Sequence, residues 1–519
     1  MARQVAHEIK NPLAVCKGYL DMLDNDNSKL NKYLPIIKKE ITQSENNTLF
    51  VLSFEFFVYL CRLFKTIKLN KMISFENVDK FNIHFYIQMH YLRFALKYVF
   101  YRKVYVKGLE NIPKKGEPVF VISNHQNGMM DPINILTNFP DKRLPVFIAR
   151  GDIFKKDAIA KILRYFRIMP TFRSRDGGRS DIMQNNVTFS IAAKILQRGG
   201  TMIMFPEAGH QHGRYLSTFK KGFPRICFAA EEEADFNLNL QILPMNLHYS
   251  DYFSFGEKVL ITIGEPFKIQ EFFEQYKTEP NKAYFAMNEK ARERVKALSI
   301  DIKDPELYEE FDLLRTMVST ARVKEQGLKV DFPELYLEEK KVIDDLDNMR
   351  EQEPAKFDDL MEKTKEYMSK LHELRLPNWV VGEKITFPNL LLRFLLGVIV
   401  APFALFGLVN NALPFFSCNA LIDKVKDPML HSSVRFGMGF FVFPVYYLIL
   451  LGVVWGISHS FWFALAYLVT TFITLYFLMY TIRGVKRFII RCHYYFTNRR
   501  NFLFQKTLAL KEQILKIMH

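Results

Sequence analysis

The residues best suited to chemistry follow a short apolar stretch in the first half of the chain. Val119–Ile122 is apolar throughout, which is typical of a strand covered on both faces. His125 comes three residues later, and Asp131 follows six residues after it. A carboxylate beside an imidazole fixes the tautomer and orientation of the ring, which can then take a proton from a hydroxyl group. The pair is therefore a candidate general base; an ordinary hydrogen bond within a loop is the alternative interpretation.

Further polar residues follow apolar stretches later in the chain. Residues 168–176 are IMPTFRSRD, and residues 201–210 are TMIMFPEAGH, in which Pro206 and Glu207 end an apolar run. LSTFKKG at 216–222 and ILPMNL at 242–247 complete the series. If each apolar run is a strand of one sheet, these polar residues gather at the ends of the strands, where α/β proteins carry their sites.

In order and spacing, these stretches resemble the four sequence blocks of the glycerol-phosphate and lysophospholipid acyltransferase family. Those blocks are a His-x4-Asp pair, an arginine after a short strand, Phe-Pro-Glu-Gly, and a strand that contains proline. The resemblance covers roughly residues 89–265. Two departures stand out: the first block is one residue longer here, and Ala208 replaces the glycine of the third block. A bulge or an extra turn residue would absorb the insertion.

The resemblance implies transfer of an acyl group from a thioester to a hydroxyl of a glycerol phosphate lipid precursor. The acyl donor would be acyl-CoA or acyl-carrier protein, used as a co-substrate, and no cofactor or metal is implied. Lysophosphatidate (1-acylglycerol 3-phosphate) is the expected acceptor, with glycerol 3-phosphate as the nearest alternative. No serine or cysteine lies in a convincing nucleophile turn, so direct attack by the hydroxyl is the simplest chemistry.

Roles for individual residues follow from the same resemblance. His125 would be the general base and Asp131 would orient it. Arg173 would clamp a phosphate, because a guanidinium matches phosphate with two parallel hydrogen bonds, and Arg175 is the second choice. The expected substrate-binding residues are Arg173, Arg175, Glu207, Gly209, Lys220 and Lys221. For the arginine at 175 and the two lysines, a merely solvated side chain is the alternative.

Composition points to a membrane partner. The formal charge of +16 implies an anionic partner: a phospholipid surface, a phosphorylated substrate or nucleic acid. The chain shows no zinc-like spacing and no recognisable nucleic-acid motif, so lipid is favoured and nucleic acid is not expected. The contents of 49 Phe and 24 Tyr are high, and the five cysteines are scattered singly, as in a reducing compartment.

The first residues suggest a different activity. MARQVAHEIKNPLAVCKGYLDML resembles the phospho-acceptor helix of sensor histidine kinases, and residues 31–47 resemble the second helix of that hairpin. His7 would then accept phosphate, but the sequence shows no asparagine box or glycine-rich ATP lid. We therefore expect residues 1–47 to be a vestigial or fused fragment, or the product of a wrongly assembled gene start. A signalling protein that works through this hairpin is the alternative function from another class.

Strands alternating with helices predict the main domain. Between residues 106 and 269 the pattern predicts an α/β acyltransferase domain, with strands near 118–122, 144–148, 169–172, 201–205, 240–247 and 258–263. Helices are predicted near 156–165, 185–196 and 225–233. Residues 48–105 are apolar or amphipathic and suit membrane association. Within them, 87–105 predicts a basic amphipathic helix, which would lie either in a membrane interface or on the catalytic domain.

The second half predicts helices and membrane spans. Residues 270–388 are charge-dense and predict a helical insert broken at Pro280, Pro305, Pro333 and Pro354; the stretch 337–353 is expected to be a solvated helical face. Residues 389–482 contain three apolar stretches of spanning length, at 389–409, 436–457 and 461–482.

The tail at 483–519 carries nine basic residues and one acid, which places it in the cytoplasm. We expect a multi-pass membrane protein whose catalytic domain also faces the cytoplasm. Three full spans would put the tail and the catalytic domain on opposite sides of the membrane. The stretch 389–409, which contains Pro402, is therefore predicted to be re-entrant. A non-catalytic lipid-binding scaffold is the remaining alternative, because the spacing between His125 and Asp131 is unusually long.

Overall fold

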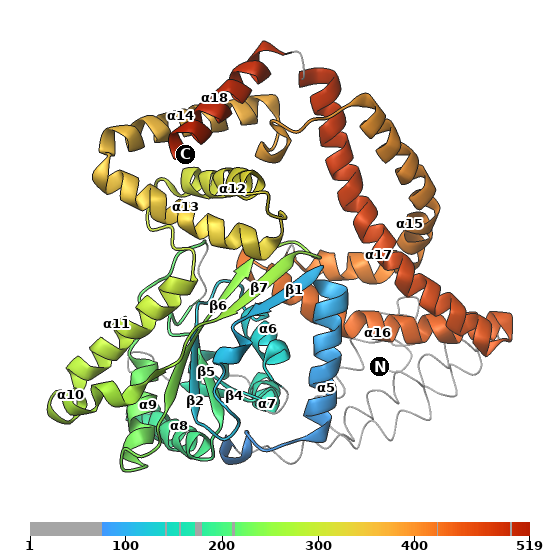
Figure 1. Ribbon diagram of the computed structural model, residues 1–519. Helices are drawn as coiled ribbons and strands as arrows, with labels where there is room; N and C mark the ends of the chain where they lie inside the picture. The colour runs from blue at the N-terminus through green and yellow to red at the C-terminus, as the bar shows by residue number, and fades with distance from the viewer. Residues whose placement is uncertain are drawn as a thin grey trace. The chain divides into compact units, whose positions relative to one another are not determined.

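The computed structural model describes residues 75–140, 143–154, 157–171, 179–209, 213–422, 424–498 and 501–519 (Figure 1). The kinase-like segment at 1–47 and the apolar residues up to 74 lie outside the described residues. Met72–Leu451 and Phe461–His519 form one compact unit. All of the elements that surround the candidate site belong to it.

A mixed sheet of eight strands forms the catalytic domain, as the alternating pattern predicted. The strand order is β1-β7-β6-β2-β5-β3-β4, with β8 paired to β6. Neighbours are parallel except where β6 meets β7 and β8. The strands are β1 (Lys103–Lys107), β2 (Val119–Ser123), β3 (Val146–Arg150), β4 (Ile168–Thr171), β5 (Thr201–Met204), β6 (Gln241–Tyr249), β7 (Lys258–Ile263) and β8 (Phe267–Lys268). The central position of β2 explains its continuous apolar run, because both of its faces are covered.

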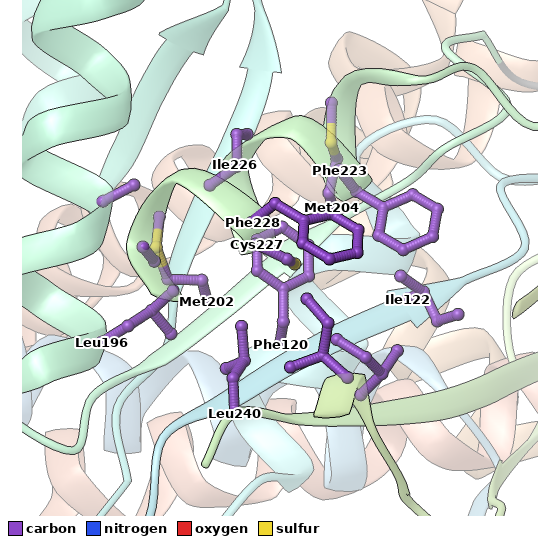
Figure 2. Packing of buried hydrophobic residues seen from close by; sticks show 14 of the residues in the cluster. Phe120, Ile122, Leu196, Met202, Met204, Phe223, Ile226, Cys227, Phe228 and Leu240 are labelled. Atoms are coloured by element: carbon purple, nitrogen blue, oxygen red, sulfur yellow. The ribbon is translucent and has the colours of Figure 1, made fainter. Parts of the chain in front are cut away.

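Alternate side chains of β2 enter two different cores. Phe120 and Ile122 join a cluster with helices on one face (Figure 2). Val119 and Val121 join a second cluster on the other face. The first face is covered by α8 (Arg179–Gln197), α9 (Gly222–Glu232) and α11 (Pro280–Leu298), and the second by α5 (Ile83–Phe94) and α6 (Met130–Asn138). This alternation fixes the register of β2, and so the direction in which its C-terminal end points.

The helix predicted at 87–105 is shorter than expected. After α5 the chain continues as a π-helical stretch, η2 (Ala95–Phe100), and then forms the outer strand β1. Lys103 and Lys107 are exposed at the two ends of this strand, and its middle is half-buried. Their charges therefore belong to an outer strand of the sheet, where basic side chains are common, and not to one face of a helix.

Five helices after the sheet follow the predicted proline positions. They are α10 (Phe273–Thr278), α11, α12 (Tyr308–Glu325), α13 (Phe332–Gln352) and α14 (Pro354–Leu374). Pro280, Pro333 and Pro354 occupy the first turns of α11, α13 and α14, where a missing N–H costs nothing. The expectation that 337–353 is only a solvated face was wrong, since Glu338 and Glu339 of α13 are buried.

Three helices in the described part of the chain are long and apolar enough to cross a membrane. They are α15 (Phe387–Ile422), α16 (His431–Ser458) and α17 (Phe461–His493), and α18 (Phe502–Met518) follows them. α15 continues as one helix through both Pro402 and Pro414, and the re-entry expected at 389–409 stays a prediction. Proline is tolerated inside such helices when neighbouring helices compensate the missing hydrogen bond.

Candidate active site

His125 and Asp131 lie beyond the C-terminal end of β2 and contact each other directly. The Nδ1 atom of His125 lies 2.9 Å from Oδ2 of Asp131. The Asp131 side chain is wholly buried, whereas that of His125 is 18% exposed. An Nδ1–H donated to the carboxylate leaves the lone pair on Nε2, which is the arrangement that a general base requires. The ring also stacks on Phe205, with centroids 4.4 Å apart, which restricts its rotation.

Four hydrogen bonds converge on Asp131. Besides the imidazole, Oδ2 accepts from the backbone N–H groups of Gln126 and Asn127, both at 2.8 Å. Oδ1 accepts from the hydroxyl of Tyr249 at 2.6 Å. Burial raises the pKa of Tyr249 far above its usual value, and the negative charge of Asp131 adds to this. The phenol therefore stays protonated and acts as a permanent donor to the carboxylate.

A tight turn absorbs the extra residue between the histidine and the aspartate. Gly128 has a φ of +44°, and the N–H of Met130 donates to the carbonyl of Asn127 across the turn. Glycine adopts such a left-handed conformation without steric cost. A side chain at this position would also collide with Leu430, whose Cδ2 lies 2.8 Å from the position of a Cβ. The longer spacing is thus compatible with direct contact between His125 and Asp131.

Glu207 holds the loop that carries the histidine. One carboxylate oxygen accepts from the backbone N–H of His125 at 2.8 Å. The other accepts from the N–H and the hydroxyl of Ser217, each at 2.9 Å. Burial raises the pKa of Glu207, while these hydrogen bonds work in the opposite direction. The two oxygens therefore join the loop after β5 to the loops that contain His125 and Ser217.

Ala208 explains why the family has glycine in this block. Its φ is +59°, in the left-handed region where a Cβ is crowded by the backbone. The neighbouring Gly209 has nothing within 4 Å of the position of a Cβ, so the turn has room beside it. Alanine at this position therefore carries local backbone strain.

Sequence reasoning did not assign several residues that shape the site. The side chain of Asn124 forms two hydrogen bonds with the backbone of Leu247, as a neighbouring strand would. Its amide nitrogen donates to the carbonyl of Leu247 at 3.0 Å, and its oxygen accepts from the N–H of Leu247 at 2.8 Å. Tyr249 and Ser217 are the others. Only their positions in the sequence could have indicated these residues: Asn124 directly precedes the histidine, and Tyr249 ends the Pro-containing strand.

The four basic residues predicted to bind substrate fall into two groups. Lys220 and Lys221 are exposed at the start of α9, and Lys221 is the residue before its first turn. The backbone N–H of Lys220 donates to the carbonyl of Pro206, which keeps the pair beside the Glu207 turn. Arg173 and Arg175 lie outside the described residues; β4 ends two residues before the first of them. In the described part of the chain, no group of three metal-binding side chains could hold a metal ion.

A family model matches the part of the chain that contains this site. Residues 103–248 match the family model described as Acyltransferase. The segment therefore belongs to the acyltransferase family, as the order of its motifs predicted. Residues 1–46 match the model for the His Kinase A (phospho-acceptor) domain, in line with the resemblance of the first helix.

Two curated relatives match parts of the chain. One is the chloroplast 1-acyl-sn-glycerol-3-phosphate acyltransferase LPAT1 of Arabidopsis thaliana, 27% identical over 24% of this chain and 32% of the relative. The other is glycerol-3-phosphate O-acyltransferase 2 of Saccharomyces cerevisiae, 22% identical over 42% of this chain and 30% of the relative. The chain thus spans about a third of the length of the curated relatives that it matches.

A solved structure also aligns with the chain. The 1-acyl-sn-glycerophosphate (LPA) acyltransferase PlsC from Thermotoga maritima is 21% identical, with a TM-score of 0.30. The alignment covers 49% of this chain and 95% of PlsC.

Proposed function

We propose that this protein is a membrane acyltransferase that moves a fatty acyl group from an acyl thioester to the free hydroxyl of lysophosphatidate. The observation that carries the proposal is the His125–Asp131 pair, held at the end of a central strand by Glu207 and Tyr249. The segment that contains the pair belongs to the acyltransferase family. Glycerol 3-phosphate is the second candidate acceptor, because the longer of the two matches is to an enzyme named for it.

The proposed reaction needs one base and one leaving thiol. Nε2 of His125 takes the proton of the acceptor hydroxyl as the oxygen attacks the thioester carbonyl carbon. A carbon–oxygen bond forms and the carbon–sulfur bond breaks, and the proton passes from the imidazole to the departing thiolate. Asp131 stabilises the imidazolium in between, since its buried carboxylate contacts Nδ1. No covalent acyl-enzyme is required.

The remaining site residues receive proposed roles in binding and positioning. Arg173 would clamp the acceptor phosphate, with Arg175 as second choice, because both follow β4. Exposed Lys220 and Lys221 suit a phosphate of the acceptor or the donor. Both oxygens of Glu207 accept hydrogen bonds from the chain, so we assign it mainly to positioning the loop of His125.

The basic tail supports a cytoplasmic catalytic domain. Nη1 of Arg483 donates to the carbonyl of Gly256 at 2.6 Å, and Nη2 lies 3.2 Å from Oε1 of Glu257. The first basic residue of the tail thus lies beside the catalytic domain. The start of α16 also contacts this domain, since the hydroxyl of Ser432 donates to the carbonyl of Tyr252. If α16 and α17 cross as a hairpin, their two domain-side ends share one face of the membrane, and the positive-inside tendency favours the cytoplasmic face.

The test uses the full chain in detergent. Radiolabelled acyl-CoA and acyl-carrier protein are each offered with lysophosphatidate, glycerol 3-phosphate and neutral lysolipids. We expect transfer to one phosphate-bearing acceptor, and a loss of at least 100-fold in the His125→Ala variant. His372→Ala is the matched control, because His372 is exposed on α14.

Two further outcomes separate the alternatives. Removal of residues 1–47 should leave acyl transfer intact, whereas loss of the only measurable activity would favour signalling through the N-terminal segment. Absence of transfer from both donors to every acceptor would contradict the enzyme and leave a lipid-binding scaffold.

A further inference from the structure

An apolar cavity of about 330 Å³ lies between η2 and the three long apolar helices. Its walls come from the end of α5, η2, the loop after β6, and α15, α16 and α17. Rings dominate these walls, including Phe100, Phe255, Phe415, Phe436, Phe440 and Phe443. The volume falls at the lower end of the range usual for small-molecule sites. Every helix of this wall lies outside the segment that matches the acyltransferase family.

Ring packing and one hydrogen bond keep the walls of the cavity in place. The ring of Phe100 makes edge-on contacts with Phe255 and Phe436, with centroids 5.2 Å away in both cases. The hydroxyl of Tyr447 donates to Oδ1 of Asn411 at 2.7 Å, which joins α16 to α15. The cavity therefore has supported walls, as a binding site requires.

One charged side chain in the cavity wall contacts the loop after β6. Of the described residues that line it, Arg435 alone carries a charge. Its guanidinium donates to the carbonyl of Phe253, and Nε lies 3.4 Å from the amide oxygen of Asn419. An apolar volume with a cation in its wall matches an amphiphile that has a hydrocarbon chain and an anionic head.

The cavity lies one helical turn from the catalytic loop. Phe436 lines it, and Ser433, three residues earlier on α16, accepts a hydrogen bond from the N–H of Met129 at 3.0 Å. Met129 lies between His125 and Asp131 in the chain. A second connection runs through Tyr252, whose hydroxyl donates to Oε1 of Gln126 at 2.7 Å. A chain inside the cavity would therefore begin close to the reacting groups.

We propose that this cavity holds the fatty acyl chain of a substrate while the reactive end of that substrate lies at His125. The inference rests on the proposed acyl transfer and adds the place of the chain. Hydrocarbon entering an apolar cavity gains about 0.8 kcal/mol for each buried methylene group. This fatty acyl chain is part of either the lipid acceptor or the thioester donor, and both present the same hydrocarbon to the cavity.

Two glycines of α16 provide a matched pair of variants. Gly439 lines the cavity, and a Cβ there would meet only Phe443, at 3.8 Å. Gly437 does not line it, and a Cβ there would meet nothing within 4 Å. Gly439→Leu therefore fills the cavity, whereas Gly437→Leu makes the same chemical change on the same helix outside it. Ala95→Leu fills the cavity from the opposite wall, on η2.

The assay compares chains of 8 to 18 carbons. One arm varies the donor chain with a fixed acceptor, and the other varies the lysophosphatidate chain with a fixed donor. We expect Gly439→Leu and Ala95→Leu to lower kcat/KM for 16- and 18-carbon chains about ten-fold relative to short chains, in one arm. That arm identifies which substrate the cavity serves. An unchanged chain-length preference in both arms, with wild-type activity retained, would overturn the inference.

Photo-crosslinking separates this inference from the proposed reaction. Diazirine-bearing palmitoyl-CoA and lysophosphatidate are bound to the full-length His125→Ala variant and irradiated. We expect labelled peptides from η2 or from 431–451 on α16, and about ten-fold less labelling when Gly439→Leu is added. Labelling confined to other peptides would overturn the cavity assignment. Labelling of these peptides without any acyl transfer by the wild type would refute the proposed reaction alone.

Discussion

Two of the histidine–carboxylate pairs among the described residues lie in contrasting surroundings, and the first is the pair proposed for catalysis. In the first, His125 is partly exposed and its ring lies 2.9 Å from a buried aspartate. In the second, Nε2 of His248 on β6 lies 3.5 Å from Oε2 of Glu339, and both side chains are at least nine-tenths buried. The first pair lies at the end of a strand in a loop, whereas the second is covered by α13.

The charges around the two pairs differ as well. Hydroxyl and N–H donors surround Asp131. Glu339 instead forms an ion pair with Arg315, which also contacts Asp312. Burial alone would raise the pKa of Glu339, but the Arg315 charge brings it down to about 2. Burial, aided by the charges of Arg214 and Arg315, lowers the pKa of His248 to about 4. Access and neighbouring charge, more than the pairing itself, thus distinguish the pair proposed for catalysis from the buried pair.

Breaking the first pair should have the largest effect. Asp131→Asn removes the charge that stabilises an imidazolium, and we expect kcat/KM to fall by about 100- to 10,000-fold. Tyr249→Phe is the matched variant, because it removes one hydrogen bond to the same carboxylate and keeps the pair; about a ten-fold loss is expected. Acyl-transfer kinetics and thermal unfolding are measured on both. A fall in activity no larger than that of Tyr249→Phe would contradict the role of Asp131.

Breaking the second pair should change stability and spare catalysis. Glu339→Gln leaves the buried Arg315 with less compensation, and we expect the free energy of unfolding to drop by about 3–5 kcal/mol. The folded fraction should keep wild-type kcat. Asp344→Asn on the exposed face of α13 serves as control and should change stability by less than about 0.5 kcal/mol. A large loss of kcat in folded Glu339→Gln would place this pair in the reaction.

Low pH should reduce the stability of the folded protein through His248 of the second pair. A pKa lowered from 6.5 to about 4 in the folded state means that the unfolded chain binds the proton more readily. The contribution of neutral His248 to the free energy of unfolding is thus fully present above pH 6.5. It is lost as the pH falls towards 4, by up to roughly 3 kcal/mol. Thermal unfolding between pH 4 and 7 should therefore be less pH-dependent in His248→Gln than in the wild type. Equal pH dependence in both proteins would rule out this contribution.

The smallest expected effect is on stability and comes from the turn beside the first pair. Ala208→Gly relieves a left-handed alanine in the turn that carries Glu207, and we expect a gain in stability of about 0.5–1 kcal/mol. Ala286→Gly, in the middle of α11, makes the same change in a helix and should lose about 1 kcal/mol. Denaturant unfolding measures both. A loss of stability in Ala208→Gly would mean that the turn is not strained.

The sequence predicted those parts of the fold that depend on local pattern. Apolar runs located six strands of the sheet, and the run of β2 is continuous because this central strand is buried on both faces. The outer strand β1 was missed, since its alternation of lysines with apolar residues continues the pattern of the preceding helix. Glu339 was placed on a solvated face because charge density along α13 says nothing about which turn meets Arg315.

The candidate site shows the same division. His125 and Asp131 were identified from residue types six positions apart. Tyr249 reaches Asp131 from 118 residues further along the chain, and no local pattern reports such a contact. The cavity is more remote still, because six separate elements meet to form it. Long-range proximity is decided by packing, which a single sequence does not display.

The close approach at Gly128 constrains how this chain can change over time. The turn between His125 and Asp131 has no room for a side chain against Leu430, and its next N–H donates to Ser433. A mutation that enlarges residue 128 must therefore be matched by a smaller residue at 430, or the loop loses its support. Positions 128, 430 and 433 should co-vary among descendants of this gene. An exchange of the C-terminal helices between relatives would have to carry the catalytic turn with it.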